Sequence, residues 1–377
     1  MFKPQVVLAS PDKVILLDLL IPLLMQFRER YDNIGITVIV YSNESYDYLQ
    51  KNYHIVEAMR IAKVRIIIAR TGRKVMDIIR MARFLLGCIG RTTVLLKARD
   101  NLPMHKRTVA IIKIFGRVLE CRALSQITVP SAKKGRASYG DLILDRVPKK
   151  QARCDVLLSS EQKGCNTKTV YMGYLKKLPA WSRFVKASYD KFKDTVDSDY
   201  YFFALSSTKD FRLKWLREPD RFDLLCETLE ALSVFSDRLY AVLKPHPVSD
   251  IDALHKAILK TGFTNYSISY AHPSVISMGA KFFISNCFSI ACTDAWRMGK
   301  PVIDYYRYDS RLENMCGGWS PGGELVDHYV KTPAGLVDTV DTILYHDKPY
   351  KRSGLYFQEP TDWRYWDAIL DKNKRTV

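Results

Sequence analysis

Residues 281–305, KFFISNCFSIACTDAWRMGKPVIDY, predict a strand, a helix and a second strand in direct succession. The apolar run 281–284 has the length of a buried strand, and 290–298 has the spacing of a helix. Gly299 ends that helix, and the apolar run 301–305 forms the next strand. A strand, a helix and a further strand make up the repeating unit of a parallel sheet covered by helices.

The same alternation runs through the rest of the chain and predicts an α/β fold. Residues 13–20 are either a buried strand or the beginning of a helix. The other expected strands are 36–42, 64–69, 92–97, 155–158, 170–174, 200–205, 238–243 and 266–269. The other expected helices are 44–60, 74–91, 104–119, 221–235, 251–260 and, with Thr361 as N-cap, 361–371.

A polar segment near Pro179 divides this pattern into two similar halves, since 377 residues exceed one typical core. We expect a first Rossmann-like domain over residues 1–175, a linker over 176–199 and a second Rossmann-like domain over 200–355. A helical segment, 356–377, follows them. We expect the two domains to face a central cleft.

The composition narrows the class of protein. Hydrophobic residues make up 47% and charged residues 26% of the chain, which excludes a mainly disordered protein. The eight cysteines form no CxxC pair and no cluster with zinc spacing, so we expect reduced thiols and no metal. The first residues lack a secretion signal, and the early apolar run 14–25 is too short to span a bilayer. We therefore expect a cytoplasmic protein, soluble or peripheral to a membrane.

Positive charge is concentrated in the first half of the chain. Residues 1–180 hold 32 Lys and Arg against 14 Asp and Glu, whereas residues 181–377 hold 26 of each. Residues 51–150 alone hold 23 basic and 6 acidic side chains, a net charge of +17. Two expected helical faces carry such cations, Lys106, Lys113 and Arg117 on the one and Arg80 and Arg83 on the other. A solvated face is the ordinary explanation, but this asymmetry favours a nucleic acid or an anionic inner membrane leaflet as partner.

Polar residues follow the expected strands at their carboxyl ends, where ligands bind in open α/β sheets. Ser206 and Ser207 follow one strand, and Lys244-Pro245-His246-Pro247 follows the next. The prolines restrict the backbone beside His246, whose imidazole can donate a hydrogen bond to a phosphate. The alternative is a proline-rich turn with a surface histidine.

A second polar group follows the strand 281–284. Ser285 and Asn286 end this strand, and Ser289 opens a helix whose hydroxyl and backbone N–H groups can bind an anion. Asp294 lies five residues further on, where a carboxylate can accept hydrogen bonds from ribose hydroxyls. The alternative is an ordinary capped helix with a solvated Asp294.

The strand followed by KPHP, together with the later S-x3-S, helix and GKPVIDY, resembles the C-terminal domain of GT-B glycosyltransferases. The similarity is greatest to bacterial enzymes of capsule and surface-carbohydrate biosynthesis, and the His-Pro pair also resembles bacterial sialyltransferases. It covers residues 200–310, while the N-terminal half shares only the alternating pattern. By this resemblance, His246, Ser285 and Ser289 hold the nucleotide phosphates, and Asp294 takes the ribose position usually filled by Glu.

The resemblance also implies an arrangement of the whole chain. The first domain would bind the acceptor, and the terminal helix would cross back onto that domain. The expected donor-binding residues are Ser206, Ser207, Lys244, His246, Ser285, Asn286, Ser289 and Asp294.

Chemistry of this kind requires no bound metal, because a helix dipole, His and Lys can offset the charge of the leaving phosphate. We expect no cofactor besides the substrate, a UDP-sugar or CMP-sugar. His246 is the expected catalytic residue on the donor side. The general base must come from the acceptor side, and Asp18, Asp100 and His105 are the candidates, each of which is otherwise a helix cap or a surface residue.

These features favour a glycosyltransferase at the cytoplasmic face of a membrane, with a surface polysaccharide or lipid-linked glycan as acceptor. A UDP-sugar 2-epimerase shares the fold but has little need for a basic half. Teichoic-acid glycerophosphotransferases have a segment similar to IDYYRYD at 303–309, but their His-Gly pair is absent here. A nucleic-acid-binding protein is the alternative from another class, without a zinc finger, RNP motif or KH loop to support it.

Overall fold

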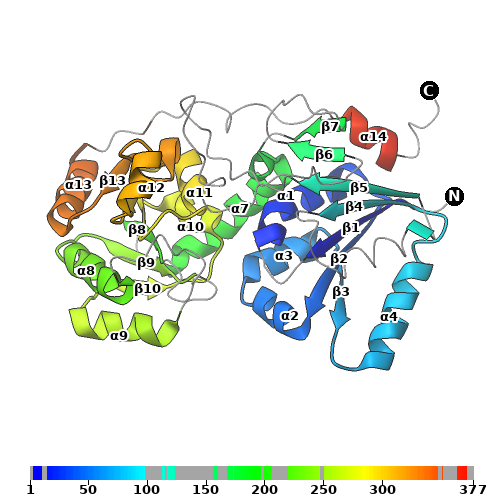
Figure 1. Cartoon of the computed structure of the whole chain (residues 1–377), viewed down its shortest axis with the longest axis horizontal. Coiled ribbons are helices and arrows are strands. Elements are labelled where there is room, and N and C mark those ends of the chain that lie inside the picture. The colour runs from blue at the N-terminus through cyan, green and yellow to red at the C-terminus, as the bar shows by residue number, and fades with distance from the viewer. Residues whose placement is uncertain are drawn as a thin grey trace. The chain divides into compact units, whose positions relative to one another are not determined.

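The computed structural model describes most of the chain as two compact units (Figure 1). The first contains the described residues up to 123, those of 156–184 and 363–371, and the second contains 185–346 and 350. Within the described ranges, none of the helices has the length and hydrophobicity needed to span a bilayer. The described residues are 3–10, 15–97, 113–114, 117–123, 156–159, 168–172, 174–196, 199–205, 220–246, 250–346, 350 and 363–371.

The first unit contains a parallel sheet of seven strands in the order β3-β2-β1-β4-β5-β6-β7. The order reverses at β1, so the topological switch point lies between the carboxyl ends of β1 and β4, as in Rossmann folds. The strands are β1 (Gln5–Ser10), β2 (Gly35–Ser42), β3 (Arg65–Arg70), β4 (Thr92–Lys97), β5 (Arg117–Ala123), β6 (Val156–Ser159) and β7 (Lys168–Tyr171).

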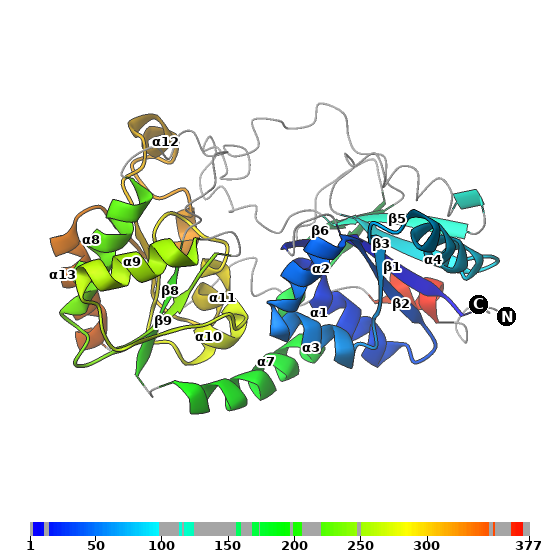
Figure 2. The ribbon, with the colours of Figure 1, turned by 90° about the horizontal axis from the view of Figure 1, so that it is seen from below.

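Helices cover both faces of this sheet, with α4 on one face and α1 and α3 on the other (Figure 2). Successive residues of a strand point to opposite faces of the sheet. Because the strands contain consecutive apolar residues, both faces of the sheet are apolar. On one side, Phe84 of α4 packs with Val7, Ile39, Ile67 and Leu95. The helices of this unit are α1 (Ile15–Arg30), α2 (Asn43–Gln50), α3 (Tyr53–Ile61), α4 (Lys74–Leu86) and α14 (Arg364–Leu370).

The C-terminal helix α14 packs against the end of α1. Arg30 donates to both carboxylate oxygens of Asp367, at 2.9 and 2.8 Å, and the Tyr31 hydroxyl donates to the same carboxylate at 2.8 Å. Trp366 is fully buried and meets the Phe27 ring edge-on at 4.9 Å. Segments from the two ends of the chain therefore share one core.

The second unit contains a parallel sheet of six strands in the order β10-β9-β8-β11-β12-β13. All five residues of β8 are buried, and the switch point lies between β8 and β11. The strands are β8 (Tyr200–Ala204), β9 (Tyr240–Lys244), β10 (Tyr266–Ile268), β11 (Phe283–Ser285), β12 (Val302–Tyr305) and β13 (His328–Val330).

Capping residues determine where two helices of this unit begin or end. Asp220 caps α8 by accepting from Phe222 N at 2.8 Å, and Gly262 ends α9 at φ 63°, which glycine adopts without strain. The helices are α8 (Arg221–Ser233), α9 (Ile251–Thr261), α10 (Pro273–Gly279), α11 (Cys292–Arg297), α12 (Ser310–Met315) and α13 (Pro333–His346). Short 3-10 helices cover Lys193–Thr195 and Gly323–Leu325 in this unit and Leu175–Lys177 in the first unit.

The segment expected as a linker is largely helical. Helix α7 (Pro179–Phe192) joins the two units, and the boundary between them falls after Phe184 within this helix. Its first turn is tied to the first unit, because Ala180 N donates to Gln26 at 3.1 Å and Arg183 pairs with Glu29 at 2.5 Å.

The predicted fold class of two Rossmann-like α/β domains is confirmed by the two sheets. Three local predictions are wrong, and of the two alternatives for 13–20 the beginning of a helix is confirmed. The strand alternative for 13–20 fails because Leu17, Leu20 and Leu24 are buried at helical spacing within α1, and the first strand is β1 instead. The expected helix 44–60 is two helices. The end of the expected helix 104–119 belongs to β5, so Arg117 lies on a strand, and 104–112 lie outside the described residues. The N-cap of α14 is Trp363, and Thr361 lies outside the described residues.

Candidate functional site

The candidate site is the edge of the second sheet where its strands end. All six strands are parallel, so their carboxyl ends lie at one edge, and the switch point between β8 and β11 is where such folds bind ligands. Lys244 is the last residue of β9, and Pro245 and His246 follow it. The His246 side chain is half-buried at this edge. Ser285 is the last residue of β11 and is 1% exposed.

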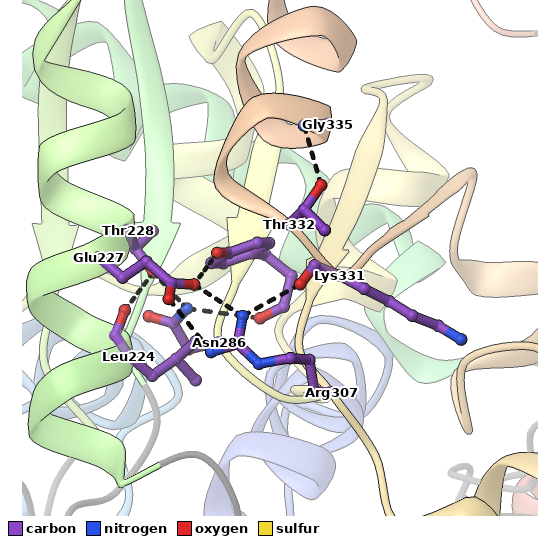
Figure 3. Close-up of polar contacts among 9 residues, drawn as sticks. Leu224, Glu227, Thr228, Asn286, Arg307, Lys331, Thr332 and Gly335 are labelled. Carbon is purple, nitrogen blue, oxygen red and sulfur yellow. Dashed lines mark hydrogen bonds and ion pairs between the residues drawn. The ribbon is translucent and has the colours of Figure 1, made fainter.

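Asn286 is buried and connects three elements of the second unit (Figure 3). Its Nδ2 donates to Thr228 Oγ1 of α8 at 2.7 Å and to the Tyr305 carbonyl of β12 at 3.4 Å. Thr228 in turn donates to the Leu224 carbonyl at 2.6 Å. The amide therefore fixes the start of the β11 loop against α8 and β12.

The loop after β11 has an unusual backbone at the switch point. Cys287 has φ 72° although it is not glycine, and its side chain is 8% exposed. Such a conformation costs about 1 kcal/mol or more and is concentrated at functional sites. Burial is the main cause that raises the pKa of the Cys287 thiol to about 12, so this cysteine is a neutral packing residue at neutral pH.

Asp304 of β12 is a carboxylate with no solvent exposure beside this loop. The hydroxyls of Tyr308 and Ser320 both donate to its Oδ2, at 2.7 and 2.5 Å, and Phe288 N donates to the Tyr308 hydroxyl at 2.7 Å. Within the described part of the chain, Oδ1 has no hydrogen-bond partner. Burial raises the pKa of Asp304 to about 7, although the two hydroxyl donors act in the opposite direction. This carboxylate therefore titrates near neutral pH.

A charged pair lies at the same edge, between β12 and α8 (Figure 3). Arg307 donates to both oxygens of Glu227, at 2.8 and 3.2 Å, and to the Lys331 carbonyl at 3.0 Å. The Tyr305 hydroxyl also donates to Glu227. Burial would raise the pKa of Glu227, but the hydrogen bonds from Arg307 and Tyr305 outweigh it and lower that pKa. The pair holds a guanidinium at the carboxyl ends of β12 and β13.

Ser289 and Asp294, both expected at the donor site, lie before helix α11 and on it, respectively. Helix α11 begins at Cys292, so Ser289 lies before it, and its Oγ accepts from Ala291 N at 3.4 Å. Asp294 is 4% exposed and accepts from the Ser274 hydroxyl of α10 at 2.7 Å. The helix expected over 290–298 therefore begins two residues later, at Cys292. The solvated alternative for Asp294 is wrong, because its carboxylate joins α10 to α11.

Of the three candidates for the general base, Asp18 is among the described residues. Asp18 lies in the first turn of α1 and pairs with Lys176 at 3.1 Å. Asp100 and His105 lie outside the described residues, as do Ser206 and Ser207 of the donor group. Among the described residues, no group of three His, Cys, Asp or Glu side chains could hold a metal ion.

Several polar residues of this edge were not predicted from the sequence. Asp304, Arg307 and Tyr308 all belong to the segment IDYYRYD, which was singled out only for its similarity to another family. The position of this segment directly after a predicted strand was the available signal. Glu227 and Ser320 gave no signal, because they reach the edge from distant parts of the chain.

Comparisons with known proteins identify the fold. No family model matches the sequence, and no curated protein matches it. A crystal structure of UDP-N-acetylglucosamine 2-epimerase matches with a TM-score of 0.50 at 10% identity, over 91% of this chain and 88% of that chain. This chain has the GT-B fold.

Other structures similar to this GT-B chain include glycosyltransferases. Anabaena Alr3699/HepE in complex with UDP and glucose has a TM-score of 0.46 at 12% identity, covering 90% of each chain. The glycosyl transferase family 9 protein from Veillonella parvula DSM 2008 has a TM-score of 0.45 at 11% identity, covering 92% of this chain and 98% of that chain. At these identities, the similarity concerns the fold alone.

Proposed function

We propose that this chain is a glycosyltransferase that binds a nucleotide sugar at the carboxyl edge of its second sheet. The observation that carries the proposal is the Rossmann strand order of that sheet, with His246, the β11 loop and Arg307 following strands near its switch point. The GT-B fold supports it, because one similar protein was crystallised with UDP and glucose.

In this proposal, the second unit offsets the charge of the departing nucleotide. His246 donates to a phosphate oxygen as the bond between that oxygen and the sugar carbon breaks, and Ser285, Ser289 and the backbone N–H groups of the β11 loop assist. Lys244 adds positive charge at the same edge. Asn286 and Asp294 hold the loop and α11 in place through the hydrogen bonds described above, and a ribose contact from Asp294 stays a prediction.

The new bond forms to an acceptor hydroxyl, which loses its proton to a base. Asp18, Asp100 and His105 remain the proposed candidates for that base. We propose a surface polysaccharide or a lipid-linked glycan as acceptor, because a basic first half suits an enzyme that works at the anionic inner face of a membrane. No metal and no cofactor besides the UDP- or CMP-sugar enters this scheme.

A UDP-sugar 2-epimerase is the second candidate. The match with a TM-score of 0.50 is to a protein of that name, and an epimerase needs the donor site without a separate acceptor. The two candidates differ in product, since an epimerase interconverts two nucleotide sugars whereas a transferase releases the nucleotide. Incubation with a nucleotide sugar, with and without a glycan acceptor, distinguishes them by chromatography.

Thermal unfolding in the presence of nucleotides tests the donor site. Wild type, His246→Ala and the control His255→Ala, an exposed histidine on α9, are heated with UDP, CMP, CDP, GDP and their sugars. A ligand at about 100 times its Kd should stabilise by roughly 2.7 kcal/mol and raise the Tm by a few degrees. We expect one nucleotide class to stabilise wild type and His255→Ala but not His246→Ala. No shift with any nucleotide, together with a clear shift with oligonucleotides, would overturn the proposal in favour of nucleic-acid binding.

A further inference from the structure

Helix α4 is apolar on both sides. On its inner side Phe84 is 1% exposed, and Met81 and Leu85 pack with it on the sheet. The outer side carries what we call the α4 stripe, at positions whose spacing follows the helical repeat and so places them on one face of the helix. The α4 stripe consists of Val75, Ile78, Ile79, Ala82 and Leu86.

The α4 stripe faces solvent. Val75 and Ile78 are each 69% exposed, Leu86 is 63% exposed and Ile79 is 41% exposed, and Met76 lies exposed beside them. A surface helix normally buries its apolar face and turns polar residues toward solvent, whereas α4 exposes a second apolar face. A contiguous exposed apolar surface of this kind marks a docking site.

Cations border the α4 stripe. Arg73, Lys74 and Arg83 are exposed on or beside the helix. The acidic residue of the helix, Asp77, is already occupied, because it accepts from Thr71 N at 3.0 Å, from the Thr71 hydroxyl at 2.6 Å and from Arg80. The charge that this face presents to a partner is therefore positive.

We propose that the α4 stripe inserts into the interfacial region of an anionic lipid bilayer, with α4 lying parallel to the membrane surface. Apolar side chains bordered by Lys and Arg are the pattern of helices that lie in this interface. A second copy of the chain fits less well, because a twofold interface through α4 would bring the cations that border the stripe, Lys74 and Arg83, near those of the other copy. The inference deepens the proposed function, since it rests on the proposed membrane location and names the surface responsible.

Vesicle co-sedimentation of the full chain tests this inference. The vesicles contain equal parts of phosphatidylglycerol and phosphatidylcholine, or phosphatidylcholine alone. The stripe variant is Val75→Ser/Ile78→Ser/Leu86→Ser. The control variant replaces three exposed apolar residues of the second unit, Val234→Ser/Leu259→Ser/Tyr345→Ser.

We expect wild type and the control variant to bind the anionic vesicles alike, and the stripe variant to bind about tenfold or more weakly, because insertion depends on apolar area. We expect Lys74→Glu/Arg83→Glu to lose its preference for phosphatidylglycerol. Equal binding by the stripe variant and wild type would overturn the inference. A dimer of wild type in light scattering, together with a monomeric stripe variant, would also overturn it. The nucleotide-induced Tm shift of the stripe variant reports on the donor site separately, so failure at the membrane and failure at the donor site are distinguishable.

Discussion

Tyr308 donates a hydrogen bond of 2.7 Å to Asp304, a carboxylate with no solvent exposure. The same hydroxyl accepts from Phe288 N at 2.7 Å. One side chain therefore joins the end of β12 to the loop that follows β11, on the side of the sheet edge where the switch point lies.

Removal of the Tyr308 hydroxyl should destabilise the second unit. Tyr308→Phe leaves the Phe288 N–H without its acceptor and takes one of two donors from Asp304, which should cost about 1–3 kcal/mol. Urea denaturation followed by circular dichroism measures the loss. Tyr270→Phe, at a 41% exposed position of the same unit, should leave the free energy of unfolding unchanged. Equal stability of both variants would show that the buried hydroxyl contributes nothing.

The stability of the protein should fall as the pH rises from about 4 to about 7, with Asp304 as a cause. Burial raises the pKa of this carboxyl from 3.8 to about 7 in the folded chain, so the folded state holds a proton over this range that the unfolded state has lost. Each pKa unit corresponds to about 1.4 kcal/mol, and the penalty is complete above pH 7. Asp304→Asn should flatten this part of the profile, measured by urea denaturation at several pH values. An unchanged slope in the variant would assign the dependence to other groups.

Glu227 and Arg307 should show a modest coupling free energy. Their side chains are 29% and 38% exposed, so solvent screening limits the pair to about 1 kcal/mol. A double-mutant cycle of Glu227→Ala and Arg307→Ala measures the coupling. Because the folded state lowers the pKa of Glu227, this contribution is present above its ordinary pKa of 4.5 and is lost as the pH falls through the lower folded value. A cycle that closes to zero at pH 7 would contradict the prediction.

Loss of the Asp367 carboxylate should loosen the end of α1. Asp367→Ala leaves Arg30 and Tyr31 without their shared acceptor and should destabilise the first unit by about 2 kcal/mol. Hydrogen exchange should report faster exchange in α1 and little change in β8. Asp338→Ala, at an exposed position on α13, is the control. Protection of α1 equal to that in wild type would mean that the aromatic packing of α14 suffices.

The strands were predictable where apolar runs are bounded by polar or turn residues. The strand predicted at 92–97 is β4 without any shift, whereas β1 was missed because QVVLAS is a single short run near the start of the chain. The apolar residues of 13–20 are compatible with either a buried strand or a buried helix. The folded chain shows that they begin a helix, because α1 continues to Arg30.

The site was predictable only in part, for a physical reason. The ends of strands can be predicted from the sequence, and His246 and Ser285 therefore lie at the edge of the sheet, as expected. The hydrogen-bond partners of buried polar groups cannot be predicted in this way, because they are far apart in the sequence. Asn286 and Thr228 are 58 residues apart, and Asp304 and Ser320 are 16 residues apart. Such pairings depend on which helix packs against which strand, and the sequence around each residue does not specify this packing.

The packing of α14 on α1 has a consequence for synthesis on the ribosome. The described residues of the second unit all lie between 185 and 350, so this unit can fold while translation continues. The first unit needs Trp366 and Asp367 to complete its contacts with Phe27 and Arg30, and these residues are synthesised after the second unit. We therefore expect the first unit to complete its core only after the second unit has been synthesised.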